Sequence, residues 1–407
     1  MKVYIKIVFL SVLIVMACKE KKSTEESSKQ LILTQTDSLD IELNAINESK
    51  ILPGFSVSVF SSDKVLYQKG FGMADLEKKT DFQPSTIQII ASTTKPFVGV
   101  ALMKAIEEEL LDLEDNINDI LPYKVVNPNF PQQKITIRML ASHTSSISGT
   151  KKSDKGYRFE TPLLASKFPN AYKPLLTNYN KTDNISMSDF LEKKLNSRGE
   201  WYDEEIFTKE KPGTSYEYSN IGIALLAHII EMKTKISFDE FTKNLIIDPL
   251  DMKSSFWELN DVPLDKHTTY YNELKNKVPN YYIITYPDGG LYSSISDMTI
   301  FLQEMMKGYD GTSKIVSKES FREMMKKQFD GEKLTEGLCW DLSFDGLIGH
   351  SGNDFGTATL MYFSPETGIG RILFTNISTE TEEQEDTFYG IFNTLFKYDF
   401  EYQKASR

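Results

Sequence analysis

The segment from Ser92 to Lys95 places a serine hydroxyl and a lysine amine three residues apart. On a helix, residues at this spacing share a face, so the amine can reach the hydroxyl and take its proton. Such a pair supports nucleophilic catalysis through an ester formed on serine. The same Ser-x-x-Lys spacing also occurs at 61–64 and 148–151, so the spacing alone is weak evidence.

The surroundings of Ser92 set it apart from the other two copies. Lys95 to Leu111 is rich in apolar residues and predicts a long helix. Proline is tolerated only in the first turn of a helix, so Pro96 places Ser92 at or just before the helix start. Backbone N–H groups there lack partners within the helix, so the N–H of Ser92 could stabilise an oxyanion. The alternative is that Ser92 only caps the helix, a common role for serine.

Two further polar segments could complete a site. Tyr218 and Asn220 precede an apolar helix and offer a phenol that can carry a proton and an amide that can donate and accept hydrogen bonds. His350 and Gly352 lie just before a predicted strand, and glycine lets a ligand approach the backbone closely, so the N–H of Asn353 could be a second oxyanion donor. Taken singly, a tyrosine is more often a core residue and a His-Ser-Gly segment more often a turn.

Together these motifs resemble those of the serine β-lactamase and penicillin-binding family, in the class C-like branch that also holds D,D-peptidases and esterases. Tyr218-Ser219-Asn220 and His350-Ser351-Gly352 stand where sibling members have S-D-N and K-T-G. Three flanking segments agree, and the resemblance runs from about residue 40 to 378; the segments are 140–145 (LASHTS), 248–252 (DPLDM) and 289–294 (GGLYSS).

The resemblance implies a role for each matching residue. Lys95 and Tyr218 would share the proton transfers, and the sequence leaves open which of the two is the general base. Asn220 would orient the lysine and the substrate. The nucleophile would be Ser92, the oxyanion donors would be the N–H groups of Ser92 and Asn353, and the remaining substrate-binding residues would be His350 and Gly352.

The chain also departs from the family pattern. His350 replaces the lysine of class C β-lactamases, and a histidine is mostly neutral at pH 7 unless a carboxylate raises its pKa. Ser146 and Asp251 stand where glycine is usual, which we interpret as changes of scaffold. His143 is interpreted as structural and His228 as a core histidine.

These features predict a serine hydrolase that forms an acyl-enzyme on a small peptide, including one with D-amino acids or from the cell wall, or on an ester. Because the lysine cation is absent, we rank a β-lactamase as the second candidate, after a peptidase or esterase. From another class of function, the alternative is a catalytically inactive lipoprotein that binds the cell wall.

The order of strand and helix patterns along the chain predicts an α+β fold. An antiparallel sheet flanked by terminal helices would be closed by both ends of the chain, with a mostly helical lobe inserted. The expected domain spans 33–402, with an α/β lobe at about 33–90 and 288–402 and a helical lobe at about 91–287. Expected strands lie at 55–60, 65–71, 337–344, 357–363 and 371–376, and expected helices near 41–46, 95–111, 137–140, 190–195, 221–230, 238–247 and 383–396.

Composition excludes several classes of function. The 407 residues carry a formal charge of −12, which repels nucleic acid. The four histidines lack metal-ligand spacing, and no cofactor motif occurs, so neither a metal nor a cofactor is expected. Two cysteines cannot build a disulfide scaffold, and the apolar setting of Cys339 predicts a buried thiol.

The N-terminal segment predicts export. Lys2 and Lys6 precede an apolar run that is too short to span a bilayer but fits a signal peptide over 1–17. The run ends in VMAC, which resembles a bacterial lipobox and predicts lipid on Cys18, and 18–32 is a polar stretch expected to be a disordered tether. The expected location is the periplasmic or outer-surface side of a membrane; the alternative is an ordinary signal peptide with an incidental cysteine.

Overall fold

The fold is described from a computed structural model. The structure describes residues 35–148, 156–167, 185–330, 335–342, 346–398 and 400. The predicted signal peptide, the tether and Cys18 lie outside these residues. In the described part, no helix combines the length and apolarity needed to cross a bilayer.

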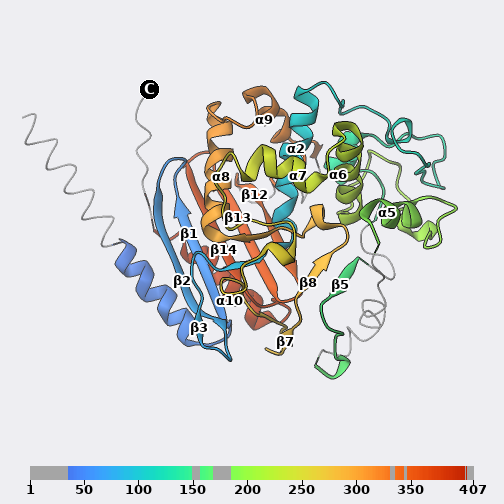
Figure 1. The fold of residues 1–407 in the computed structure, drawn as a ribbon. Coiled ribbons are helices and arrows are strands. Elements are labelled where there is room, and N and C mark those ends of the chain that lie inside the picture. The colour runs from blue at the N-terminus through green and yellow to red at the C-terminus, as the bar shows by residue number, and fades with distance from the viewer. Residues whose placement is uncertain are drawn as a thin grey trace, which may run out of the picture.

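A six-stranded antiparallel sheet forms the centre of the molecule (Figure 1). Its order is β12-β13-β14-β1-β2-β3, so the hairpin of β1 and β2 pairs with β14 from the other end of the chain. The predicted closure of the sheet by both ends of the chain is therefore confirmed. The strands are β1 (Gly54–Phe60), β2 (Val65–Asp75), β3 (Thr80–Asp81), β12 (Ile348–Asp354), β13 (Thr357–Ser364) and β14 (Ile369–Thr375).

The two faces of this sheet pack against different helices. Alternate strand residues such as Val57 and Leu373 share one cluster with Leu39 of a helix over 35–48 and with Phe392 of α10 (Glu382–Thr394). The opposite face packs on α8 (Ile295–Asp310), where Thr299 donates to Ser58 Oγ at 2.8 Å. The period of two along each strand thus separates a face covered by the terminal helices from a face covered by the helical region.

The helical region contains two long buried helices, α2 and α6. α2 and α6 are apolar almost throughout because both pack inside the largest hydrophobic cluster. The helices of this region are α2 (Lys95–Glu107), α3 (Ile137–Ala141), α5 (Met187–Leu195), α6 (Asn220–Thr234) and α7 (Phe238–Thr242). A further helix, α9 (Lys318–Met324), follows α8 in the chain and packs beside it.

Short elements join the sheet to the helices. Four two-stranded sheets pair β4 (Ile87–Ile89) with β9 (Tyr292–Ser294), β5 (Tyr157–Phe159) with β8 (Tyr281–Ile283), β6 (Tyr270–Tyr271) with β7 (Lys277–Val278), and β10 (Phe329–Asp330) with β11 (Thr335–Glu336). Single turns of helix are η1 (Ala91–Thr94), η2 (Ile117–Asp119), η3 (Ala165–Lys167), η5 (Glu204–Ile206), η6 (Lys243–Ile247), η7 (Leu259–Asp261) and η8 (Tyr286–Asp288).

The predicted strand at 337–344 is wrong over its described part. Residues 337–340 form a turn in which the N–H of Gly337 bonds to the carbonyl of Trp340, and Cys339 has a φ of +62°, outside the range of a strand. The apolar run reflects burial, because Trp340 and Cys339 are both inaccessible to solvent. The buried free thiol predicted for Cys339 is confirmed.

Two residues that replace the glycines usual in the family have positive φ angles. Ser146 and Asp251, which stand where glycine is usual, have φ values of +64° and +56°. This left-handed region favours glycine, and serine or aspartate adopts it at some cost. The side chain of Ser146 is held by Asn127, whose Nδ2 donates to Ser146 Oγ at 2.9 Å. The chain keeps these turns without the glycines.

Candidate active site

Ser92 lies in the single turn η1 that connects β4 to α2. Ala91, directly before it, has a φ of +50°, so the chain bends sharply at this point. The hydroxyls of Thr93 and Thr94 hold the turn by donating to the carbonyls of Ile90 and Ala91 at 2.6 and 2.7 Å. The residue at the N-cap position of α2 is Thr94 rather than Ser92. The hydroxyl of Ser92 is therefore not used to cap the helix.

Lys95 lies beside Ser92, as the spacing predicts. Its Nζ donates to Ser92 Oγ at 2.9 Å and also to the backbone carbonyl of Asp288 in η8. The side chain is completely buried. Burial lowers the pKa of Lys95 to about 8, against the charge of Asp288, which raises it. A substantial fraction of this amine is thus neutral near physiological pH.

Tyr218 completes the group from the segment that precedes α6. Its hydroxyl and that of Ser92 are hydrogen-bonded, and its ring centroid lies 5.0 Å from Lys95 Nζ. Burial raises the pKa of Tyr218 well above its ordinary value, although the hydrogen bond with Ser92 acts in the opposite direction. The phenol is therefore neutral at physiological pH.

His143 holds the segment that carries Tyr218. Its Nδ1 accepts a hydrogen bond from the N–H of Ser219 at 3.1 Å, and its carbonyl accepts one from the N–H of Glu217 at 2.8 Å. The two bonds flank Tyr218, whose ring centroid lies 4.6 Å from that of His143. Burial lowers the pKa of His143 well below its ordinary value, so the imidazole is neutral. The structural role expected for His143 thus includes positioning Tyr218.

The His350 segment forms the edge strand β12 rather than a turn. A Cβ atom on Gly352 would lie 2.8 Å from the carbonyl oxygen of Ile90 and 2.9 Å from the backbone nitrogen of Ser92. Only glycine therefore lets β12 pack so closely on η1. This packing also brings Asn353 to the cavity beside Ser92.

His350 is neutral, as the sequence suggested. Burial and the charge of Lys95 lower its pKa to about 4, although the charge of Asp341 acts to raise its pKa. Its Nδ1 lies 2.6 Å from the carbonyl oxygen of Ser351. The position that carries a fixed cation in class C β-lactamases is therefore uncharged here.

Among the described residues, no hydrogen bond joins Asn220 or His228 to Ser92, Lys95 or Tyr218. Asn220 is the first residue of α6, and its Oδ1 is buried without a hydrogen-bond partner among the described residues. Its predicted role in orienting lysine and substrate stays a prediction. His228, further along α6, is 8 % exposed and lies 3.0 Å from a carboxylate oxygen of Glu231, which agrees with a core histidine.

A cavity of about 300 Å³ opens on these residues. Its lining comes from the catalytic candidates, from the paired strands β12 and β13, and from α10. The contribution of α10 has no signal in the sequence, because it depends on how a helix near the end of the chain packs. The lining residues are Ser92, Tyr218, His350, Ser351, Gly352, Asn353, Ala358, Thr359, Leu360, Thr379, Glu385, Phe388 and Tyr389.

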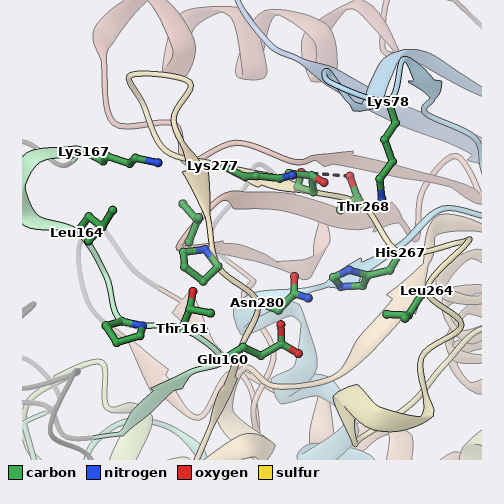
Figure 2. Close-up of a pocket in the computed structure, with 14 residues that line it drawn as sticks. Lys78, Glu160, Thr161, Leu164, Lys167, Leu264, His267, Thr268, Lys277 and Asn280 are labelled. Carbon is green, nitrogen blue, oxygen red and sulfur yellow. Dashed lines mark hydrogen bonds between the residues drawn. The ribbon is translucent and has the colours of Figure 1, made fainter.

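A larger cavity of about 470 Å³ contains none of the predicted site residues (Figure 2). Lysines reach its rim, but Lys277 pairs with Glu77 at 3.2 Å and Lys78 lies 3.7 Å from Asp75. Its histidine, His267, is kept neutral because burial lowers its pKa to about 4. No group of three metal-ligating side chains occurs in the described ranges, here or at Ser92.

The chain is similar to known proteins over most of its length. A family model described as Beta-lactamase matches residues 42–396. Protein flp of Staphylococcus aureus (strain N315) is 25% identical over 339 residues, covering 81% of this chain and 60% of that protein. The mitochondrial serine beta-lactamase-like protein LACTB of Homo sapiens is 26% identical over 311 residues, covering 66% of this chain and 56% of that protein. The chain thus spans about 60% of the length of these relatives.

Solved structures show the same fold. The octameric penicillin-binding protein homologue from Pyrococcus abyssi superposes with a TM-score of 0.66 and 25% identity, covering 88% of this chain and 77% of that one. A class C beta-lactamase superposes with a TM-score of 0.66 and 17% identity, covering 89% and 96%. The predicted arrangement of an antiparallel sheet with flanking and inserted helices is confirmed.

Proposed function

Because this chain belongs to the beta-lactamase family, whose members are serine hydrolases, we propose that it is a serine hydrolase working through an acyl-enzyme at Ser92. The observation that carries the proposal is the hydrogen bond of 2.9 Å from the buried amine of Lys95 to Ser92 Oγ. Tyr218 approaches the same hydroxyl from the segment that precedes α6. A nucleophile with two proton carriers in contact is the arrangement that serine catalysis needs.

In acylation, Ser92 Oγ attacks the carbonyl carbon of the substrate while its proton passes to Lys95. The bond to the leaving group then breaks, and the leaving amine or alcohol receives a proton through Tyr218. Water attacks the ester on Ser92 in the second half and restores the enzyme. With a pKa of about 8, roughly one lysine in ten is neutral at pH 7. The raised pKa of Tyr218 makes its phenolate rare, which favours Lys95 as the base.

The oxyanion would be stabilised by the N–H groups of Ser92 and Asn353. The close approach of Gly352 to the backbone nitrogen of Ser92 supports this assignment, because it brings β12 alongside the turn η1. Backbone donors that are fixed before the reaction starts lower the barrier by stabilising charge only in the transition state.

For the substrate, we propose a peptide, including one with D-amino acids or from the cell wall, or an ester. The neutral state of His350 supports this ranking, because a β-lactam carboxylate would find no fixed cation there. A β-lactamase is the second candidate, favoured by the similarity of fold to class C enzymes.

The test combines labelling with turnover. We expect a fluorophosphonate or a fluorescent penicillin to label the purified protein, and Ser92→Ala to abolish labelling. Ser61→Ala is the matched control, because Ser61 belongs to another Ser-x-x-Lys copy and bonds Asp63 in a hairpin turn. Rates with nitrocefin, a p-nitrophenyl ester and a D-Ala-D-Ala peptide rank the substrates. Neither labelling nor turnover would indicate a binding lipoprotein, and turnover retained in Ser92→Ala would end the proposal.

We also propose that the protein is exported and anchored by lipid on Cys18. The support is the VMAC segment after an apolar run, followed by a polar stretch. Metabolic labelling with an alkynyl fatty acid in a bacterial host should mark the protein and place it in the membrane fraction. Cys18→Ser should abolish both, and a soluble, unlabelled parent protein would contradict the proposal.

A further inference from the structure

The wall that α10 contributes to the cavity at Ser92 carries a charge that the rest of the cavity does not balance. Of the described lining residues, Glu385 has the one side chain that is charged at neutral pH. His350 is neutral because burial and the charge of Lys95 lower its pKa to about 4, and burial raises the pKa of Tyr218 and keeps it neutral. Lys95 does not line the cavity; it is fully buried and already donates to Ser92 and to the carbonyl of Asp288.

Glu385 is accessible to a ligand. It is exposed in the first turn of α10, and no salt bridge to it occurs within the described part of the chain. The cap of the helix is made by other residues, since Thr381 and Gln384 form a reciprocal capping box. The Glu385 carboxylate therefore takes no part in the capping box.

Tyr389 lies one helical turn after Glu385 and lines the same cavity. Residues four apart share a helix face, and both burial and the charge of Glu385 raise the pKa of Tyr389. Tyr389 is 38% exposed, while Phe388 is nearly buried and supports the wall. A carboxylate beside an exposed aromatic ring attracts an ammonium group and repels a carboxylate.

We infer that Glu385 and Tyr389 select substrates by charge, so that the enzyme prefers a substrate with a primary ammonium group near the scissile bond over one with a carboxylate. This inference rests on the proposed function, because it concerns the substrate of the acyl-enzyme at Ser92. The expected substrates are esters or amides that carry an amine.

The test uses p-nitrophenyl esters of equal length whose acyl chains end in an ammonium, a methyl or a carboxylate group. A second trio of esters carries the same three groups on the leaving alcohol. In at least one trio, we expect kcat/KM to be about tenfold higher for the ammonium ester than for the carboxylate ester, the effect of a partly solvated charge pair. Raising the salt concentration should shrink this ratio, because the carboxylate is exposed.

Variants of Glu385 and Tyr389 test whether these two residues cause the charge preference. Glu385→Gln should reduce the ratio to near one, and Glu385→Lys should invert it. Tyr389→Leu should lower it about threefold through loss of the ring, while Tyr389→Phe retains it. Glu383→Gln is the matched control, since Glu383 is exposed on the same helix but does not line the cavity.

The two proposals fail in different ways. If the parent enzyme hydrolyses the esters without a charge preference, or if Glu385→Lys keeps the ammonium preference, this inference is wrong and the proposed function stands. If no ester, peptide or lactam is hydrolysed and Ser92 is never labelled, the proposed function is wrong and the inference falls with it.

Discussion

The Nζ atom of Lys95 lies 2.9 Å from Ser92 Oγ, and no part of the lysine side chain reaches solvent. Desolvation therefore does two things at once. It favours the neutral amine, which can accept the proton of Ser92, and it places an ionisable group where its charged form is unfavourable. Both consequences can be measured.

The first prediction concerns the pH dependence of turnover. If neutral Lys95 is the base, kcat/KM on an uncharged ester should fall about tenfold per pH unit below a midpoint near 8, the pKa of this amine. Tyr218→Phe should lower kcat about 10²- to 10⁴-fold and keep this midpoint, because the phenol would only relay the proton. A profile without an inflection between about pH 7 and 9, or a midpoint lost in Tyr218→Phe, would argue for the tyrosine as base.

The second prediction concerns stability. The pKa of Lys95 is lowered in the folded protein, so between about pH 8 and 10.5 the unfolded chain binds more protons, and stability from this group rises with pH. Lys95→Met should therefore raise the free energy of unfolding by about 1–3 kcal/mol at pH 7. The gain should stay constant below about pH 8 and vanish above 10.5. Urea titrations at several pH values measure it, and a gain that grows with pH would contradict the sign.

The third prediction tests the contact between β12 and η1. Gly352→Ala would put a methyl group 2.9 Å or less from the backbone of Ser92 and Ile90, so the strand must move away. We expect a loss of kcat of about 10²-fold, as for one displaced oxyanion donor. The matched control is Gly390→Ala in α10, where nothing lies within 4 Å of the new Cβ. The control should keep activity and stability; equal effects in the two variants would argue against a special role for Gly352.

The fourth prediction concerns His143, which we place as a positioning residue. His143→Ala removes the acceptor of the Ser219 N–H and should lower kcat more than it raises KM, because Tyr218 loses its fixed position. His143→Asn should restore much of kcat, since its amide oxygen can replace Nδ1 and asparagine tolerates the φ of +55° at this position. Thermal melting of both variants separates a loss of fold from a loss of position. If alanine and asparagine variants are equally impaired at equal stability, the hydrogen bond is not what positions Tyr218.

Local sequence patterns correctly predicted the helices and hairpins whose interactions are made between residues close together in the chain. The helix after Ser92 follows from Pro96 and the apolar run, although it ends at Glu107 rather than Leu111, because Glu109 has a φ of +57°. The hairpin of β1 and β2 follows from alternation around a polar turn. The lysine beside the serine follows from helical spacing. In each case, the interaction is made within a few residues of chain.

Sequence patterns gave the wrong structure where a segment is buried by residues far away in the chain. Residues 337–340 are apolar because they pack between helices, yet they form a turn and not a strand. The helix α8 and the pair of β4 and β9 were not predicted. The α10 helix was predicted, but not its place in the wall of the cavity.

Local patterns therefore specified the chemical groups, the helix that holds Ser92 and Lys95 together, and the four inner strands of the sheet, but not the edge strand β12. Only the tertiary structure decided the environment of those groups. The pKa of Lys95, the neutrality of His350 and the charge that α10 adds to the cavity all depend on desolvation and on segments brought together across hundreds of residues. Spacing along the chain specifies which atoms are neighbours on one helix, but the free energy of a charge depends on everything that surrounds it in space.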